Sequence, residues 1–464
     1  MKRWLLWTGK SLLLLLLVAS MAAASLWLYP KYHGVAGSAP PVQASRWALR
    51  NVTLLNPGEL ALPARTVVVE QGRIVSILDS DAALSAETVV VDGHGGWLIP
   101  GLIDAHVHVI DEADLALLLA RGFTSVRNML GRPVHLEMRK AVEVGRLAGP
   151  RLITAGPVLD TPHASGSFHL DLHSEQEARE AVRESAAAGY DLVKIYDGLS
   201  PALYQAAIDE SRKQHLPVAG HLPRQVPLPQ LLADMQSIEH VEELWNHGLK
   251  KASATEVDAA ADAFAERKVP LVATLAIVQR LADVCGKGKA AIERLDGPNL
   301  NPLFAFLGRR SLGGWVEGSE GCDEWQGEVD RMGGIVRRMQ ERGAIIALGS
   351  DSGPHLSEHG ALALDEMDRL QAAGLSAEQV LIAATRNAAL ALGRAEQLGR
   401  IAPGYSADAL LLDADPRIDL ATLRTPQGIL AEGRWYERPA IEALLESGRD
   451  HANVWLSAGR LLED

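Results

Sequence analysis

The sequence predicts an α/β protein, a (β/α)8 TIM barrel accompanied by a small β-domain that is formed from both chain ends. Eight short runs rich in Val and Ile alternate with helical stretches over residues 102–351, which is the pattern of such a barrel. Further β-type runs precede this region and return after it. A doubly wound open sheet is the alternative, but no glycine-rich dinucleotide-binding motif follows the first predicted strand. We therefore favour the barrel.

Residues 1–30 have the features of an export signal. Basic residues in the first ten positions precede an apolar run over 11–29. This charge asymmetry keeps the N-terminus in the cytoplasm, so we expect the remainder to be exported to the periplasm or another extracytoplasmic space. Ala22 and Ala24 resemble a cleavage site, whereas the length of the apolar run suits a membrane anchor. A cleaved signal peptide and a retained anchor both stay open, and only an anchor would hold the protein at a membrane.

Two separate parts of the chain are expected to build the small β-domain. Residues 46–98 contain the Val- and Ile-rich runs NVTLLN and TVVVEQGRIVSIL and most of ETVVVDGHGGWLIPG. Residues 396–437 contain GRIAPGYSADALLLDADP and GILAEGRWYE. These two parts flank the barrel, which is expected over 99–395, so their strands can meet in one domain. The final segment, 438–464, has a helical pattern.

The barrel region supplies eight candidate strands, separated by helical stretches such as EADLALLLARG and EQEAREAVRESAAAG. In chain order the strands are LIDAHVH, FTSVRNM, RLITAG, LVKIY, PVAGH, SIEHV, PLVATL and AIIALGSD. Active-site residues of such barrels lie at the carboxyl ends of the strands. The last residues of these runs are therefore the candidates for chemistry.

The longest insertion lies between the seventh and eighth strands, over residues 278–328. It would hang over the active-site face of a barrel, either as a surface elaboration or as a lid that contacts substrate. It contains the two cysteines, Cys285 and Cys322, whose spacing differs from the C-x-x-C pattern of zinc and redox motifs. In an oxidising compartment they could form one disulfide, and two free thiols are the alternative.

The composition narrows the class of ligand. The chain of 464 residues is 47% hydrophobic and 22% charged, an ordinary globular composition that allows a large core. Its formal net charge of −13, with Lys and Arg scattered along the chain, disfavours nucleic acid as a partner. We expect a small molecule or a dipeptide as the ligand, and the composition leaves a homo-oligomer open.

Metal-ligating residue types stand at the ends of four predicted strands. His106 and His108 lie two residues apart, so in an extended strand both imidazoles share one face. The fifth, sixth and eighth strands end in His221, His240 and Asp351. Taken alone, each residue has a structural explanation, such as core packing, a turn histidine or a helix-capping acid. In a barrel, however, all of them would converge on one rim, which favours a site for a divalent metal such as zinc.

Lys194 lies in the fourth predicted strand, between Val193 and Ile195. An ammonium group cannot ligate a metal, and its burial between two apolar residues is costly. A desolvated lysine loses its proton readily, and the neutral amine can act as a nucleophile.

The order of these motifs resembles the metal-dependent amidohydrolase superfamily. The motifs are GLIDAHVH, VKIY, VAGHLP, SIEHVEEL and GSDSG, framed by DGHGGWLIPG and GRIAPGYSADALLLD. More narrowly, the chain is similar to the imidazolonepropionase-like and prolidase-like branch. The resemblance covers residues 52–437, and its motifs are highly specific in combination. It implies that the two-part β-domain is a β-sandwich.

The resemblance also implies a binuclear centre of two divalent metal ions, expected to be zinc. In binuclear members the lysine at the place of Lys194 is carboxylated by carbon dioxide, which turns it into a bridging carbamate. The implied ligands are His106, His108 and Asp351 for one ion, and His221 and His240 for the other. The implied reaction is hydrolysis of a C–N amide bond, in which Asp351 passes a proton to the leaving amine.

Two positions depart from the patterns of the family. Pro223 stands where relatives often carry a second histidine, so the substrate preference of those relatives is not transferred. Arg224 stands where mononuclear deaminases of the superfamily usually have a general-acid glutamate. Together with Lys194, this difference favours amide hydrolysis over loss of ammonia from a ring. The expected substrate is a dipeptide or an N-acyl amino acid that carries a free carboxylate.

Three residues are candidate contacts to substrate. Tyr196 shares a strand face with Lys194, so its hydroxyl could act in catalysis on the tetrahedral intermediate, and packing inside the barrel is the alternative. His163 resembles a loop histidine that contacts substrate in relatives, although two other histidines lie nearby. Arg224 is a candidate partner for the carboxylate of the substrate.

Two other functions remain as alternatives. A lactonase or cyclic-amide hydrolase would use the same metal core, so the sequence does not separate it from an enzyme that cleaves dipeptides. A non-catalytic relative would keep the barrel as a binding module. Such proteins usually lose metal ligands, and this chain keeps every donor.

Overall fold

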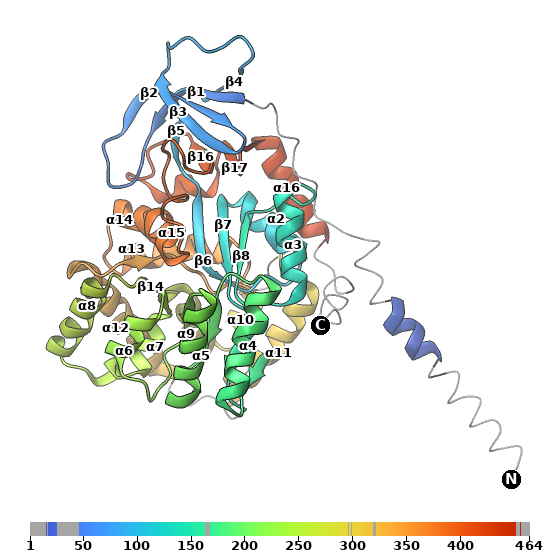
Figure 1. Ribbon diagram of the computed structural model, residues 1–464, viewed down its shortest axis with the longest axis vertical. Helices are drawn as coiled ribbons and strands as arrows, with labels where there is room; N and C mark the ends of the chain where they lie inside the picture. Colours follow the sequence, from blue (N-terminus) through green and yellow to red (C-terminus); the bar gives the residue numbers. More distant parts are fainter. Residues whose placement is uncertain are drawn as a thin grey trace, which may run out of the picture.

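An α/β fold is confirmed by the computed structural model, in which parallel strands alternate with helices (Figure 1). The β-rich end lies at the top of Figure 1, and helices surround the lower part of the molecule. The structure describes residues 15, 17–25, 46–162, 168–295, 297, 299–318, 322–451 and 455.

Two parallel sheets carry the strands that were predicted for the barrel. The smaller sheet has the order β6-β7-β8, with bounds Leu102–Val107, Phe123–Asn128 and Arg151–Thr154. The larger sheet has the order β10-β9-β11-β12-β13-β14-β15. Its strands are β9 (Val158–Asp160), β10 (His169–Asp171), β11 (Val193–Ile195), β12 (Val218–Gly220), β13 (Ser237–Glu239), β14 (Leu271–Val272) and β15 (Ile346–Ala347). The short strands β9 and β10 were not predicted, and the other strands coincide with the eight predicted runs.

Isolated β-bridges join the two parallel sheets. Ala155, just after β8, pairs in parallel with Leu192, just before β11. At the other edge, Val107 of β6 pairs in parallel with Ser352, which follows β15. The carboxyl ends of β6 and β15 therefore lie side by side.

Helices follow most of the parallel strands, and local sequence explains several of their ends. Ser174 accepts a hydrogen bond from the Glu177 N–H at the start of α4, and Ser253 and Glu256 form a reciprocal capping box at the start of α8. Gly189 ends α4 with a φ of 87°, which glycine adopts without steric cost. These helices are α2 (Glu112–Ala120), α3 (Pro133–Glu143), α4 (Glu175–Ala188), α5 (Pro201–Gln214), α6 (Leu228–Asp234), α7 (Val241–Asn246), α8 (Ala254–Arg267), α13 (Ala361–Ala372), α14 (Ala377–Ile382) and α15 (Ala388–Ala391).

The predicted insertion is helical. It comprises the end of α9 (Leu275–Lys287), α10 (Lys289–Leu295), α11 (Pro302–Gly318) and the start of α12 (Cys322–Glu341). A disulfide joins Cys285 to Cys322 across a sequence separation of 37 residues, so the end of α9 is tied to the start of α12. Of the two states that the sequence left open for the cysteines, the structure has the disulfide.

Strands from both parts of the predicted β-domain join one eight-stranded sheet. Its order is β18-β17-β16-β5-β1-β2-β3, and β4 pairs with β1. Trp47, Val67 and Ile74 from the first part share an apolar cluster with Leu430 and Trp435 from the second. The strands are β1 (Arg46–Leu54), β2 (Leu62–Glu70), β3 (Arg73–Asp79), β4 (Val89–Asp92), β5 (Trp97–Pro100), β16 (Ala409–Leu412), β17 (Gly428–Ala431) and β18 (Arg434–Glu437).

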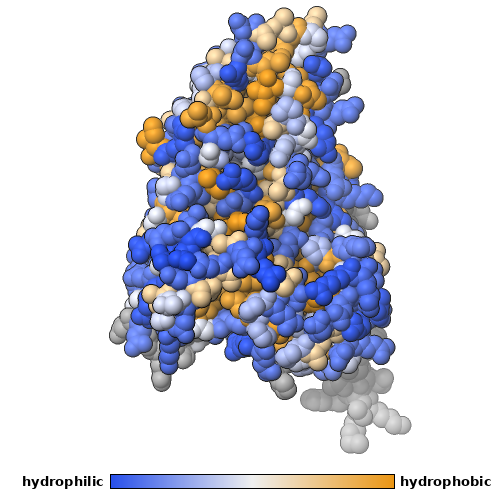
Figure 2. Space-filling view, turned by 60° about the vertical axis from the view of Figure 1, so that its left-hand side comes forward, coloured by the Kyte–Doolittle hydropathy of each residue, from blue (hydrophilic) through white to orange (hydrophobic). Residues whose placement is uncertain are grey.

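The surface in the view of Figure 2 is largely hydrophilic, with an apolar band at the end formed by the eight-stranded sheet. Large apolar side chains of this sheet that are exposed include Leu62, Val75, Val89 and Val90. The cavity that the next subsection describes lies in the parallel sheets, away from this end.

The two ends of the chain are described only in part. Residues 17–25 are helical, and the rest of the predicted signal or anchor over 1–30 lies outside the described residues, apart from Leu15. Among the helices that the structure describes, none combines the length and the apolar character needed to span a membrane. At the other end, α16 (Arg438–His451) agrees with the predicted helical segment.

Candidate metal centre

The six predicted donors line one cavity of about 660 Å³. They come from the carboxyl ends of parallel strands, which place their last residues on the same rim. The donors are His106 of β6, His108 just after it, Lys194 of β11, His221 after β12, His240 after β13 and Asp351 beyond β15. The structure therefore brings together every residue that was predicted to hold metal.

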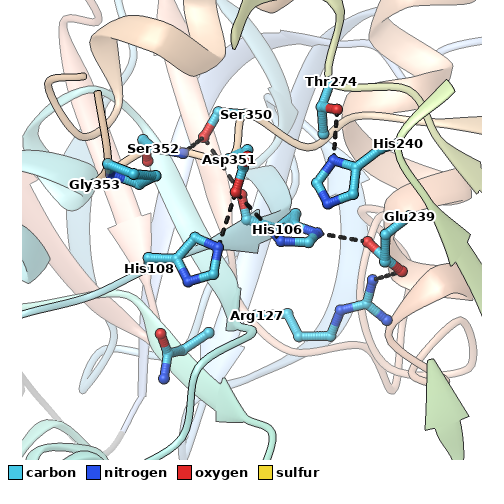
Figure 3. A network of polar contacts seen from close by, with 12 residues as sticks. His106, His108, Arg127, Glu239, His240, Thr274, Ser350, Asp351, Ser352 and Gly353 are labelled. Atoms are coloured by element: carbon cyan, nitrogen blue, oxygen red, sulfur yellow. Dashed lines mark hydrogen bonds and ion pairs between the residues drawn. The ribbon is translucent and has the colours of Figure 1, made fainter. Parts of the chain in front are cut away.

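The histidines of the first strand meet the acid that follows the last one. Asp351 Oδ1 lies 2.8 Å from His108 Nε2 and 3.4 Å from His106 Nε2 (Figure 3). The ring centroids of His106 and His240 are 4.5 Å apart, and those of His221 and His240 are 4.8 Å apart. One ligand atom each from His106, His240 and Asp351 lies within 4.8 Å of the others, a spacing that suits a metal ion.

Two of the donors have strained backbones. His240 and Asp351 have φ angles of 67° and 58°, in the left-handed region that residues other than glycine seldom adopt. Hydrogen bonds hold this backbone, because the Asp351 N–H donates to the His106 carbonyl and the His108 N–H donates to the Ser352 carbonyl, each at 2.8 Å. Strain of this kind costs ~1–3 kcal/mol per residue and is concentrated at functional sites.

A buried ion pair holds His106 through its second ring nitrogen. His106 Nδ1 lies 2.8 Å from Glu239 Oε2, and Arg127 Nη2 lies 2.7 Å from Glu239 Oε1. Figure 3 shows this chain of contacts leading from Arg127 through Glu239 to His106. Because a carboxylate paired with arginine has no proton to give, Nδ1 of His106 must be the donor. The lone pair of His106 is therefore on Nε2, the atom that faces Asp351.

His240 is also held through one ring nitrogen, and a carboxylate lies beside one ring nitrogen of His221. His240 Nδ1 lies 2.8 Å from Thr274 Oγ1, just before α9 (Figure 3). His221 Nδ1 lies 3.2 Å from Glu243 Oε1, within ion-pairing distance. In metal sites such partners orient the imidazole ring and leave its other nitrogen for the ion.

Burial prepares these side chains to bind a cation. It lowers the pKa of His106 and His221 well below the usual value, and that of His240 to about 3, so these imidazoles are neutral at neutral pH. Burial alone would raise the pKa of Asp351, but the hydrogen bond from His108 holds it well below its usual range. Burial also lowers the pKa of Lys194 to about 8, which makes the neutral amine accessible.

Three buried nitrogen atoms of the donors lack a hydrogen-bond partner within the described part of the chain. They are Nε2 of His106, Nζ of Lys194 and Nδ1 of His221, the last of which has the Glu243 carboxylate 3.2 Å away. An unpaired buried polar atom costs ~1–3 kcal/mol, so Nε2 of His106 and Nζ of Lys194 each require a group that the polypeptide does not supply. A divalent cation would satisfy His106 Nε2 beside the carboxylate of Asp351. The residues present therefore fit the metal that the sequence predicts.

Tyr196 lines the cavity next to the donors, as predicted from its strand position. Its ring stacks on His221, with centroids 3.7 Å apart and an interplanar angle of 25°. The ring of His169 lies 4.5 Å away on another side. Burial raises the pKa of Tyr196, so its hydroxyl keeps its proton and can donate a hydrogen bond.

The other two predicted substrate contacts, unlike Tyr196, are not found in the lining of the cavity among the described residues. Arg224 does not line the cavity, and its exposed guanidinium pairs with Asp197, with Nε 2.8 Å from Oδ2. The aspartate neutralises the charge that was predicted to receive a substrate carboxylate. His163 lies outside the described residues.

Several polar residues of the cavity were not predicted to contact substrate, among them Glu242, His169 and Arg132. Glu242 lies two residues after His240, and burial raises its pKa to about 7. His169 of β10 has its Nδ1 3.0 Å from Asp160 Oδ2. Arg132 lies between β7 and α3. The sequence signal for Glu242 and Arg132 is their proximity to predicted strand ends, in HVEEL and NMLGRP, whereas His169 is only one of the histidines near His163.

The helical insertion contributes to the same cavity. Leu281 of α9 and Leu307, Gly308 and Ser311 of α11 line its wall. The sequence left open a surface elaboration and a segment that contacts substrate, and this placement favours contact with substrate.

A family model and several curated proteins match most of this chain. The model of the amidohydrolase family matches residues 97–448. An uncharacterized protein of Mycobacterium tuberculosis is 28% identical and is matched over 81% of this chain and 94% of its own length. The ochratoxinase of Aspergillus niger is 22% identical over 86% of this chain and 88% of its own. The imidazolonepropionase of Chromobacterium violaceum is 23% identical over 82% of this chain and 94% of its own.

Several solved structures resemble this chain in fold. A bottromycin amidohydrolase has a TM-score of 0.73 at 22% identity, covering 92% of this chain and 96% of its own, and it shows likeness of fold. A structure described as a putative prolidase from Bifidobacterium longum has a TM-score of 0.66 at 26% identity, covering 87% of this chain and 99% of its own. The family model, together with the imidazolonepropionase and prolidase matches, confirms the superfamily that the motifs indicated.

Replacement of Glu239 by glutamine should weaken metal binding ~10–100-fold, the usual effect of losing a partner that orients a ligand. The glutamine amide cannot accept hydrogen bonds from both Arg127 and His106 Nδ1, so His106 loses the contact that fixes its orientation and tautomer. The measurement is the dissociation constant for zinc, obtained by competition with a chelating dye for the wild type and Glu239→Gln.

Glu366→Gln is the matched control for this experiment. Glu366 is also fully buried, burial raises its pKa to about 8, and it accepts a hydrogen bond from the Ala276 N–H rather than from a metal donor. The control should bind zinc as the wild type does. If a folded Glu239→Gln protein bound zinc as tightly as the wild type, the orienting role of Glu239 would be wrong.

Proposed function

The chain belongs to the amidohydrolase family, and on this basis we propose that it is a binuclear metal-dependent hydrolase that cleaves a C–N amide bond of a small substrate. The family match supports amide hydrolysis in general. The proposed substrate class is a dipeptide or an N-acyl amino acid with a free carboxylate. The observation that carries the proposal is the convergence of the six donors on one cavity.

Two divalent ions, proposed to be zinc, would be held in this cavity. His106, His108 and Asp351 would hold one ion, His221 and His240 the other, and a carbamate on Lys194 would bridge them. The spacing of His106, His240 and Asp351 supports a metal at this point. Bound divalent ions lower the pKa of water and polarise a carbonyl group.

Lys194 would become a ligand by reaction with carbon dioxide. The neutral Nζ attacks the carbon atom, an N–C bond forms and a proton is released, which leaves an anionic carbamate. Burial of Lys194 supports this step, because it lowers the pKa to about 8 and so makes the neutral amine accessible. The carbamate has the anionic oxygen atoms that a site for two cations needs, and an ammonium group does not.

Asp351 is the proposed proton carrier. Its carboxylate lies between His106 and His108, so it can accept a proton from the attacking water and deliver it to the amine as the C–N bond breaks. This proton matters because an amine is a poor leaving group unless it is protonated. Tyr196 would donate a hydrogen bond from its protonated hydroxyl to the oxygen of the tetrahedral intermediate.

The finer features of the predicted fold are part of the proposal. We propose that the parallel strands close into a (β/α)8 TIM barrel over 99–395, and the two β-bridges between the parallel sheets support this closure. We propose that 46–98 and 396–437 together form a β-sandwich. The sheet and the apolar cluster that these two parts share support a common domain.

Export is proposed from the charge asymmetry of residues 1–30, and the disulfide supports it because disulfides persist in oxidising compartments. Alkaline phosphatase fused to the C-terminal end should therefore be active in intact cells. The matched control is the same fusion without residues 1–30, which should stay inactive. An inactive full-length fusion would contradict export.

Lys194→Ala should lose metal, because the bridging group disappears. Elemental analysis should find two zinc ions per chain in the loaded wild type and fewer in the variant, and short carboxylic acids should partly restore metal and activity. Mass measurement under native conditions should show the carbon dioxide adduct on the wild type alone. An unmodified Lys194 in fully active protein, or one ion or none in the wild type, would refute the binuclear model.

Asp351→Asn should lower the rate of amide hydrolysis by at least ~10²–10⁴-fold, the usual contribution of general acid–base catalysis. Tyr196→Phe should lower the rate of amide hydrolysis by a smaller factor, because it removes only one hydrogen bond from the intermediate. The measurement is kcat for the zinc-loaded protein on a panel of dipeptides, N-acyl amino acids and lactones. Much faster turnover of lactones would favour the lactonase, and a loaded protein that hydrolyses nothing in the panel would favour the binding module.

A further inference from the structure

The cavity that holds the donors is larger than the smallest substrates of the proposed reaction. Its volume is about 660 Å³. Cavities of this size normally bind ligands of drug size, and a dipeptide of two small residues fills only part of the space. Room is therefore left beside the scissile bond for a bulky group.

One wall of the cavity is apolar. It consists of Ile277 and Leu281 of α9 and Leu307 of α11, which we call the α9–α11 wall. Leu307 is 43% exposed although it is a large apolar residue in a concave site. Apolar surface that faces a cavity rather than the core marks a place where a ligand binds.

Arg132 lines the cavity on the other side of the metal-ligand strands. Along the rim, β7 pairs with β6, β6 is bridged to the segment after β15, and β15 pairs with β14, which α9 follows. Arg132 lies after β7, so along the rim the strand ends that carry His106 and Asp351 stand between it and β14, which leads into α9. Apart from Lys194, Arg132 is the only Lys or Arg among the described residues that line the cavity.

We propose that the substrate lies across the donors with its carboxylate on Arg132 and a bulky apolar acyl group against the α9–α11 wall. The inference rests on the proposed function and narrows its substrate class to N-acyl amino acids with a long aliphatic or aromatic acyl group. A guanidinium binds a carboxylate through two parallel hydrogen bonds, and Arg132 lies over the ring of Phe168, 5.9 Å from its centroid. The two contacts flank the donors, so they fix the direction in which the amide lies.

The acyl contact is tested with N-acetyl-, N-octanoyl- and N-phenylacetyl-alanine as substrates of the zinc-loaded protein. The wild type should prefer the two bulky acyl groups to acetyl by at least about tenfold in kcat/KM, because only they reach the wall. Leu307→Trp should abolish this preference by filling the space beside the wall while the acetyl substrate is still hydrolysed. Equal rates for acetyl and bulky substrates in the wild type would overturn the inference.

Phe306→Trp is the matched control, because Phe306 precedes Leu307 on α11, is 59% exposed and does not line the cavity. It should keep the preference of the wild type. Leu307→Ser provides a second variant that adds no bulk, and it should reduce the preference by removing apolar surface. Retention of the full preference in a folded Leu307→Ser protein would contradict the contact.

The carboxylate contact is tested with N-octanoyl-alanine and its carboxamide. Arg132→Gln should raise KM for the acid by at least about tenfold and leave KM for the carboxamide unchanged, because only the acid uses the guanidinium. Arg224→Gln is measured in parallel as the rival assignment that the sequence suggested. Loss of the preference for the acid in Arg224→Gln instead of Arg132→Gln would overturn the inference.

The results separate this inference from the proposed function. Hydrolysis of all these amides without a preference for bulky acyl groups would overturn the inference and leave amide hydrolysis standing. If the zinc-loaded wild type hydrolysed none of the amides, the proposed function itself would be wrong.

Discussion

The ion pair between Arg127 and Glu239 is the interaction on which the geometry of the candidate metal centre depends. Both side chains are fully buried, and charges removed from water are costly unless hydrogen bonds compensate them. Arg127 Nε donates to the Ala105 carbonyl at 2.7 Å, and Glu239 accepts from both Arg127 and His106. These groups are all satisfied in one arrangement, and that arrangement directs Nε2 of His106 toward Asp351. The fold thus uses a buried charge to set the geometry of a ligand.

The parallel strands and the helical insertion contribute different parts of the site. Parallel strands end on the same rim, so donors that are far apart in the sequence meet there, and the strained backbones of His240 and Asp351 turn their side chains into the cavity. The insertion adds residues of α9 and α11 to the wall of the same cavity, and the disulfide between Cys285 and Cys322 ties the end of α9 to the start of α12. The parallel sheets thus carry the donors, and the insertion carries the apolar wall beside them.

The strands and the donors could be predicted because their signals are local. His106 shares a face with its neighbour two residues on, and each strand is a short apolar run. Glu239 could not be assigned, because it precedes His240 in the sequence but contacts His106, 133 residues away. Arg224 was predicted as a partner for the substrate carboxylate, yet its guanidinium pairs with Asp197, which the sequence did not reveal. Arg132 follows a strand without any histidine at its end, so only the three-dimensional arrangement reveals it.

Anomalous diffraction at the zinc edge, from crystals of the zinc-loaded protein, would show directly whether the cavity holds two ions. Two peaks are expected in the cavity, one beside His106, His108 and Asp351 and one beside His221 and His240, with density for a carbamate on Lys194 between them. A single peak, peaks away from these residues, or an unmodified Lys194 between two ions would contradict the proposed binuclear centre.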